Sequence, residues 1–149
     1  MTMMDFKGPG FRMQVPTEWY VMSSPQYQAM FLAPPIEGEK LRTNLMVTIR
    51  PVNSDVTIKS VVELAKETQQ KEYPGYKILG ESPLIKEADG ILIHYKWLNR
   101  DNGIPVVQQQ AIFIIGSMLY TFTSTRPDSE AGAQVDGTFN EMIASLKFT

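Results

Sequence analysis

The chain has 149 residues, which suits one domain that buries about 70% of the surface exposed by its unfolded form. A composition of 43% hydrophobic and 20% charged residues is typical of a globular protein and argues against intrinsic disorder. The net charge of −2, without a basic run, disfavours nucleic acid as a partner, and the lack of cysteine excludes disulfides, thiolate catalysis and Cys-ligated zinc.

The first ten residues show no periodic pattern and no apolar signal-peptide core, so we expect residues 1–10 to be flexible and residues 11–149 to form a single domain. No window of the chain approaches eighteen apolar residues, which predicts no insertion into a membrane. These features favour a cytoplasmic location. A secreted protein whose signal has been removed upstream of Met1 would look the same.

Three strands are predicted in the first half. Phe11–Val15 alternates apolar and polar residues and stops at Pro16. Tyr27–Ala33 ends at two prolines, and Asn44–Arg50 is rich in residues that favour strands. The sequence therefore begins as a set of short strands.

The pattern then changes to the spacing of a helix. The residues that recur at helical spacing are Ile58, Val61, Val62, Ala65 and Gln69, with Asp55 or Thr57 available as the N-cap. Pro74-Gly75 stops the pattern, so we expect a helix that ends near Tyr73.

Strands dominate the second half. The predicted strands are Tyr76–Glu81, Leu84–Lys86, Ile91–Leu98, Val106–Ile115 and Leu119–Thr125. Gly116-Ser117 suits a two-residue type II′ hairpin turn, and Asn102-Gly103 marks another reversal. A closing helix is expected over Ser129–Leu146, interrupted at Gly137. This order predicts an α+β fold: an antiparallel sheet of about six or seven strands with two main helices packed on it.

One predicted strand contains an unusual run, VVQQQAIFII, at Val106–Ile115. A buried amide without a partner costs roughly 1–3 kcal/mol, so three glutamines in an apolar strand need an explanation. Because side chains alternate between the faces of a strand, Gln109 points away from Gln108 and Gln110. We expect Gln109 to meet a partner, and Gln108 and Gln110 to face the opposite layer or solvent.

Candidates for catalysis are few. His94 is the single histidine, and an enzyme that uses it as a base is one hypothesis. No nucleophile motif accompanies it, and a histidine hydrogen-bonded at the sheet surface is the simpler interpretation. The sequence contains neither a phosphate-binding loop nor a set of metal ligands at a recognised spacing, so we expect no cofactor and no metal.

The opening segment FRMQVPTEW, at Phe11–Trp19, resembles the "strand, Pro, x, x, Trp" start of the PsbP-like superfamily, which also contains DcrB-like proteins and the Eag-type chaperones of bacterial type VI secretion. The similarity extends over roughly Phe11 to Phe148. It includes Pro74–Lys77, Tyr95-x-Trp97, the Gln109 strand and Thr121-x-Thr123-x-Thr125-x-Pro127, in the order associated with the Eag-type branch.

This resemblance implies a non-enzymatic, homodimeric adaptor in the cytoplasm. Such a chaperone shields the apolar, transmembrane-like N-terminal segments of a secreted effector and helps to load it onto the secretion spike. The partner-binding positions implied by the resemblance are Gln28, Met30, Leu45, Val47, Ala65, Gln69, Tyr73 and Gln109.

The residues themselves support part of this assignment. Ala65, Gln69 and Tyr73 are four apart and share a helix face, and Leu45 and Val47 share a strand face. The apolar positions could instead belong to the core. A second hypothesis is an accessory subunit of the PsbP-like or DcrB-like kind, which binds a folded, membrane-associated complex.

Overall fold

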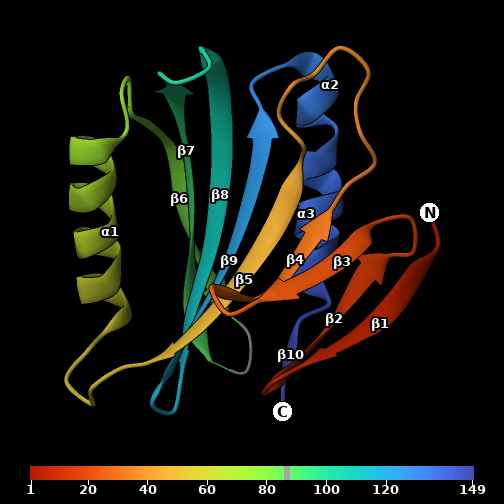
Figure 1. Cartoon of the computed structure of the whole chain (residues 1–149). Helices are drawn as coiled ribbons and strands as arrows, with labels where there is room; N and C mark the ends of the chain where they lie inside the picture. The colour runs from red at the N-terminus through yellow and green to blue at the C-terminus, as the bar shows by residue number, and fades with distance from the viewer. Residues whose placement is uncertain (86–87) are drawn as a thin grey trace.

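The computed structural model describes residues 1–85 and 88–149 and contains two antiparallel sheets and two main helices (Figure 1). The larger sheet has seven strands in the order β3-β4-β5-β9-β8-β7-β6. These strands are β3 (Tyr20–Ser24), β4 (Tyr27–Leu32), β5 (Asn44–Pro51), β6 (Lys77–Ile85), β7 (Asp89–Asn99), β8 (Ile104–Ile115) and β9 (Met118–Pro127). The predicted α+β class is confirmed.

The smaller sheet has three strands: β1 (Met3–Gly8), β2 (Phe11–Pro16) and β10 (Lys147–Phe148). Its presence corrects the expectation that residues 1–10 are flexible. Strand β1 pairs with β2 along its whole length, and the Phe6 ring packs edge-on against Phe31, with 4.9 Å between centroids. Pairing with β2 and packing on the large sheet order this segment, and the sequence shows neither interaction.

Strand β6 also differs from the prediction, because the segments predicted as Tyr76–Glu81 and Leu84–Lys86 form one strand; Lys86 itself lies outside the described residues. Pro83 continues the strand opposite Ile91. Proline is tolerated there because β6 is an edge strand, so the missing N–H interrupts no ladder on its outer side.

Helices α2 (Glu130–Ala133) and α3 (Val135–Ala144) replace the single closing helix that was expected. The break falls at Gln134 rather than at Gly137, which lies inside α3. Phe139 and Met142 of α3 are fully buried against β2 and the large sheet.

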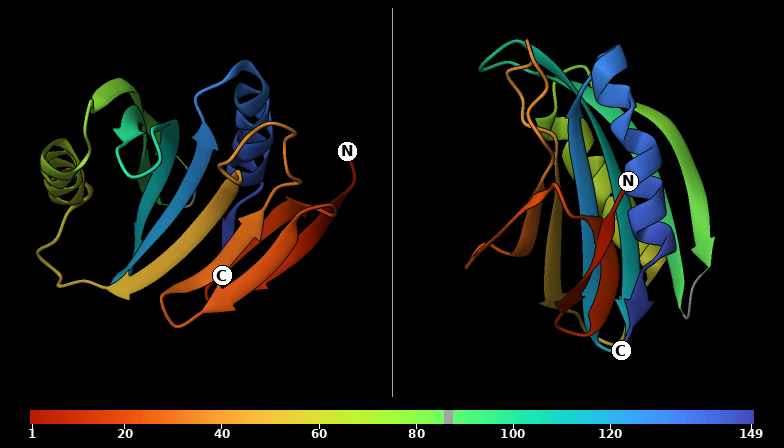
Figure 2. Two further views of the ribbon diagram at one scale, coloured as in Figure 1. Left: turned by 45° about the horizontal axis from the view of Figure 1, so that its top comes forward. Right: turned by 90° about the vertical axis from the view of Figure 1, so that its right-hand side faces the viewer.

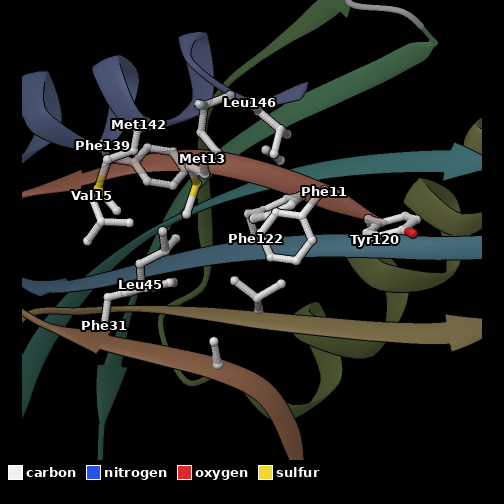
Figure 3. Packing of buried hydrophobic residues seen from close by; sticks show 14 of the residues in the cluster. Phe11, Met13, Val15, Phe31, Leu45, Tyr120, Phe122, Phe139, Met142 and Leu146 are labelled. Atoms are coloured by element: carbon white, nitrogen blue, oxygen red, sulfur yellow. The ribbon is translucent and has the colours of Figure 1, made fainter. Parts of the chain in front are cut away.

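One face of the large sheet, which we call the α3 face, is covered by α3 and by the small sheet. Figure 3 shows Met13 and Val15 of β2 lying between α3 and the large sheet. Phe11 meets Phe122 edge-on, with ring centroids 5.4 Å apart. This layer contains most of the buried apolar side chains and forms the main core.

The opposite face, the α1 face, carries α1 (Ile58–Glu72). The left view in Figure 2 shows α1 and α3 on opposite sides of the twisted sheet. A capping box between Thr57 and Ser60 starts α1, which selects Thr57 from the two predicted N-caps. The helix ends before Pro74-Gly75, where Gly75 adopts φ +67°.

Candidate binding groove beside helix α1

A groove with a volume of about 510 Å³ separates α1 from the α1 face of the large sheet. This volume lies within the usual range of roughly 300–1,000 Å³ for ligand sites. Its walls are one side of α1, the segment that precedes α1, and strands β5, β9 and β8. We call it the α1 groove, and it is lined by Arg50, Val52, Val56, Ser60, Val61, Leu64, Ala65, Thr68, Gln69, Tyr73, Gln110, Ile112, Leu119 and Thr121.

The three helix positions predicted for the site do meet at this groove. Ala65 and Gln69, four residues apart on one face of α1, and Tyr73, the residue that caps the end of α1, all line it. Gln69 is buried, with 6% of its surface exposed. The ring of Tyr73 stacks on Trp97 of β7, with centroids 4.2 Å apart and planes 11° apart. This stacking holds the C-terminal end of α1 against the sheet.

The predicted strand positions divide between the two faces. Met30 lies on the α1 face, and the alternation of β4 places Gln28 there too. Leu45, Val47 and Gln109 point to the α3 face, so the structure does not bring them to the groove. Leu45 and Val47 are completely buried in the main core, and Gln109 is 6% exposed.

The residues one position along from these three face the groove side instead. They are Met46, Thr48 and Gln110. Neighbouring residues of a strand point to opposite faces of the sheet. A prediction that is wrong by one residue therefore places the side chain on the wrong face.

Gln110 is a residue of the groove that sequence reasoning missed. Its Oε1 accepts a hydrogen bond from Nε2 of Gln69 at 3.0 Å, and its Nε2 donates to Oγ1 of Thr123 at 3.3 Å. Tyr76 donates its hydroxyl proton to Oε1 of Gln69 at 2.8 Å. A continuous polar chain therefore runs from the end of α1 through Gln69 and Gln110 to β9. It fixes the distance between helix and sheet.

A second hydrogen-bonded chain lies two residues away along β8, where Trp97 Nε1 donates to Gln108 Oε1 at 3.0 Å and Gln108 Nε2 donates to Oγ1 of Thr125 at 2.9 Å. The sequence contains a feature from which both sets of hydrogen bonds could have been predicted. The turn at Gly116-Ser117, with Gly116 at φ +60°, sets a register that pairs Gln108 with Thr125 and Gln110 with Thr123.

Three tyrosines, Tyr73, Tyr76 and Tyr95, pack against one another beside these chains. Tyr95 is completely buried, and within the part of the chain that the structure describes its hydroxyl has no hydrogen-bond partner. Burial, with smaller contributions from Tyr73 and Tyr76, raises the pKa of Tyr95 well above its usual value. Burial also raises the pKa values of Tyr73 and Tyr76, so all three phenols are neutral donors near neutral pH.

A row of methionines continues the groove wall across the sheet. Met22, Met30 and Met46 are direct register partners on β3, β4 and β5, and the next partners in the row are Thr123 and Gln110. Met22 is 40% exposed and the other two are partly exposed. Helix α1 packs against β7 and β8, at the other end of the sheet (Figure 1). We call these three residues the methionine row.

Methionine side chains adapt to irregular apolar partners because they are unbranched and have several rotatable bonds. Leu64 on α1, with 61% of its surface exposed, adds apolar surface to the helix side of the groove. Together these side chains form an open apolar surface beside hydrogen-bonded amides.

The α3 face holds a separate polar cluster around His94. Arg126 forms a bidentate salt bridge with Asp136 of α3: its Nε donates to Oδ1 at 2.7 Å and its Nη2 donates to Oδ2 at 2.9 Å. His94 Nε2 is buried and has no hydrogen-bond partner among the described residues, which differs from the hydrogen-bonded surface histidine that the sequence suggested. Burial lowers the pKa of His94; the nearby Asp136 carboxylate opposes this shift and Arg126 adds to it.

In the described ranges 1–85 and 88–149, no group of three or more His, Cys, Asp or Glu side chains could hold a metal ion. None of the described helices is long and apolar enough to cross a membrane.

Solved structures with the same architecture define the class of fold. CyanoP, the cyanobacterial PsbP of Synechocystis sp. PCC 6803, matches with a TM-score of 0.68 at 16% identity over 99% of this chain and 92% of its own. LpqN of Mycobacterium tuberculosis, described as involved in cell envelope biogenesis, matches with a TM-score of 0.76 at 15% identity, over 99% and 91%. PA94 of Pseudomonas aeruginosa, a protein of unknown function, matches at 0.70 with 14% identity, over 99% and 97%. The molecule therefore has a PsbP-like α+β fold.

The family is narrower than the fold class. The model of the DcrB family matches residues 15–145, so the chain belongs to the DcrB family. A search of curated protein sequences finds no match to this chain. The resemblance to the PsbP-like and DcrB-like superfamily is thus confirmed.

Proposed function

We propose that this protein is a non-enzymatic adaptor that binds an apolar helical segment of a partner protein along the α1 groove and the methionine row. The observation that carries the proposal is the continuity of these two surfaces: partly exposed methionines of three strands lie in register with Thr123 and, beyond it, with Gln110, which lines the groove. Large apolar surfaces that remain open to water are typical of sites for protein partners.

The polar chains suit the same partner. A docked apolar segment excludes water, so any hydroxyl or amide that it carries then needs a partner in the protein. Thr121 and Gln110 in the groove wall can supply hydrogen bonds at this point. The site therefore fits a segment that is mainly apolar with a few small polar residues, as a transmembrane-like helix is.

In its specific form, the proposal is a cytoplasmic, homodimeric chaperone of the Eag type. It would shield the apolar N-terminal segment of a type VI secretion effector and assist loading onto the spike. Membership of the DcrB family and the sequence resemblance support this form. In this form of the proposal the groove residues bind the apolar segment. Leu45, Val47 and Gln109, which point to the other face of the sheet, do not.

Co-expression with the protein encoded by the neighbouring reading frame tests the proposal. Met22→Glu should reduce co-purification at least about tenfold, because a carboxylate would have to be buried against the partner. Val21→Glu is the matched control: Val21 is 36% exposed on the same strand but points to the other face. Loss of binding by both variants, or by neither, contradicts the proposed surface. Light scattering during size-exclusion chromatography should give twice the chain mass of 16.8 kDa for the dimer.

A second candidate is an accessory subunit for a folded complex at the cell envelope. The fold shared with LpqN, whose description names cell envelope biogenesis, favours it. A signal peptide or lipobox encoded upstream of Met1 would support this candidate, as would binding that is unaffected by Met22→Glu.

A further inference from the structure

The α1 groove contains a charge that the proposed function does not use. Arg50 is the one charged residue among the residues that line the groove; the rest are apolar side chains, hydroxyls and amides. Arg50 is exposed, and in the described part of the chain no carboxylate lies within ion-pair distance of its guanidinium. An arginine held beside an apolar surface without a partner is suited to a carboxylate from outside, because its planar fork binds carboxylates through two hydrogen bonds.

Arg50 lies at one end of the groove. The residues of β5 that point to the α1 face are, in order, Asn44, Met46, Thr48 and Arg50. Arg50 therefore lies near the C-terminal end of the strand. Val52 and Val56, which precede α1, and Ser60 in its first turn line the groove near this end, whereas Tyr73 marks the end of the helix. The positive end of the α1 dipole is therefore on the same side as Arg50.

The two ends of the groove therefore differ in charge, and this difference specifies a direction. A helix carries partial negative charge at its C-terminus and partial positive charge at its N-terminus. If it lies antiparallel to α1, its C-terminal end meets both Arg50 and the positive end of the α1 dipole. In the reverse direction, its own positive end would meet them.

We infer that the groove selects an apolar helical segment that is followed on its C-terminal side by one or two acidic residues, and that the Arg50 guanidinium binds the carboxylates of these residues. The segment runs antiparallel to α1. This inference rests on the proposed function and adds the charge and direction of the partner to it. Arg50 is a specificity-determining residue in this arrangement.

Two probes of identical composition test the inference. Each is a Leu/Ala/Ser helix of about fifteen residues, the length of α1, fused between a soluble fluorescent carrier and a neutral Gly/Ser tail. One has Glu-Glu directly after the helix and the other has Glu-Glu directly before it. Binding to the full chain is measured by fluorescence anisotropy at low salt and at about 1 M NaCl, where the screening length falls to about 3 Å.

The probe with the C-terminal acidic flank should bind about fivefold tighter at low salt, as expected for one partly exposed ion pair together with the helix dipoles. High salt should remove the preference. Arg50→Gln should also remove it, and Arg50→Glu should reverse it. Lys147→Glu makes the same change in net charge on the small sheet and should leave the preference intact.

Equal binding of the two probes to the wild-type protein, or a preference that survives Arg50→Gln, would overturn the inference while leaving the proposed function in place. Failure of both probes to bind at any salt concentration would overturn the proposed function and the inference together. Circular dichroism of the Arg50 variants separates a lost preference from a lost fold.

Discussion

The hydrogen bond between Gln69 of α1 and Gln110 of β8 allows a quantitative test of how the helix is held. Gln110→Leu removes the acceptor of Gln69 Nε2, and Gln69 is only 6% exposed. A buried donor left without an acceptor costs about 1–3 kcal/mol. The partly exposed leucine recovers a small part of this loss, so we expect a net decrease of about 1–2 kcal/mol in the free energy of unfolding. Unfolding temperatures should fall by about 2–8 °C for a chain of this size.

The double variant Gln69→Leu/Gln110→Leu should be close to neutral, because the donor and the acceptor of this hydrogen bond are then both absent. Tyr76 loses its acceptor, but its hydroxyl is partly exposed and can turn to water. The two single substitutions should therefore show a coupling energy of about 1–2 kcal/mol in urea denaturation. The matched control is Gln69→Leu with Gln109→Leu, which lies on the opposite face and should be additive with it. Additive behaviour of the Gln69 and Gln110 variants would refute the polar chain as the link between helix and sheet.

Two further predictions concern single side chains. Because burial lowers the pKa of His94, the unfolded chain takes up a proton first as the pH falls below about 6.5; stability should be fully present above this value and decrease as the pH falls from there towards the lowered pKa of the folded state. His94→Leu should flatten this part of the stability profile, and an unchanged slope in denaturation at several pH values would count against the assignment. Hydrogen peroxide, which transfers one oxygen to a thioether and leaves water, should oxidise Met22 well before Met13 and Met142, which are 1% and 0% exposed. Peptide mass mapping should show this order together with weaker binding of the apolar probe, and full binding by protein oxidised at Met22 would contradict a role for the methionine row.

Several elements could be predicted because their causes are local. The helix from Ile58 to Glu72 has its capping residue, its apolar spacing and its Pro-Gly stop within one short segment. The hairpin at Gly116-Ser117 is likewise set by a glycine that can adopt positive φ. Strand β1 was missed because its order depends on β2 and Phe31, which form its surroundings only in the folded chain.

The site was predicted in part for the same reason. Four-residue spacing is enough to place Ala65, Gln69 and Tyr73 on one helix face, and all three line the groove. Spacing along the chain cannot decide in the same way whether Gln109 or Gln110 faces the groove. Period two separates the residues into two sets but does not say which set faces α1.

The sequence by itself therefore determined the α+β class, the main helix and the sets of residues that share a face. The tertiary structure decided which set belongs to the groove, because α1 and α3 dock on opposite faces of the sheet and each strand has side chains on both. Leu45, Val47 and Gln109 became core, while Met46, Thr48 and Gln110 face the α1 side. The assignment depends on contacts between segments far apart in the chain, and no local pattern of residues encodes it.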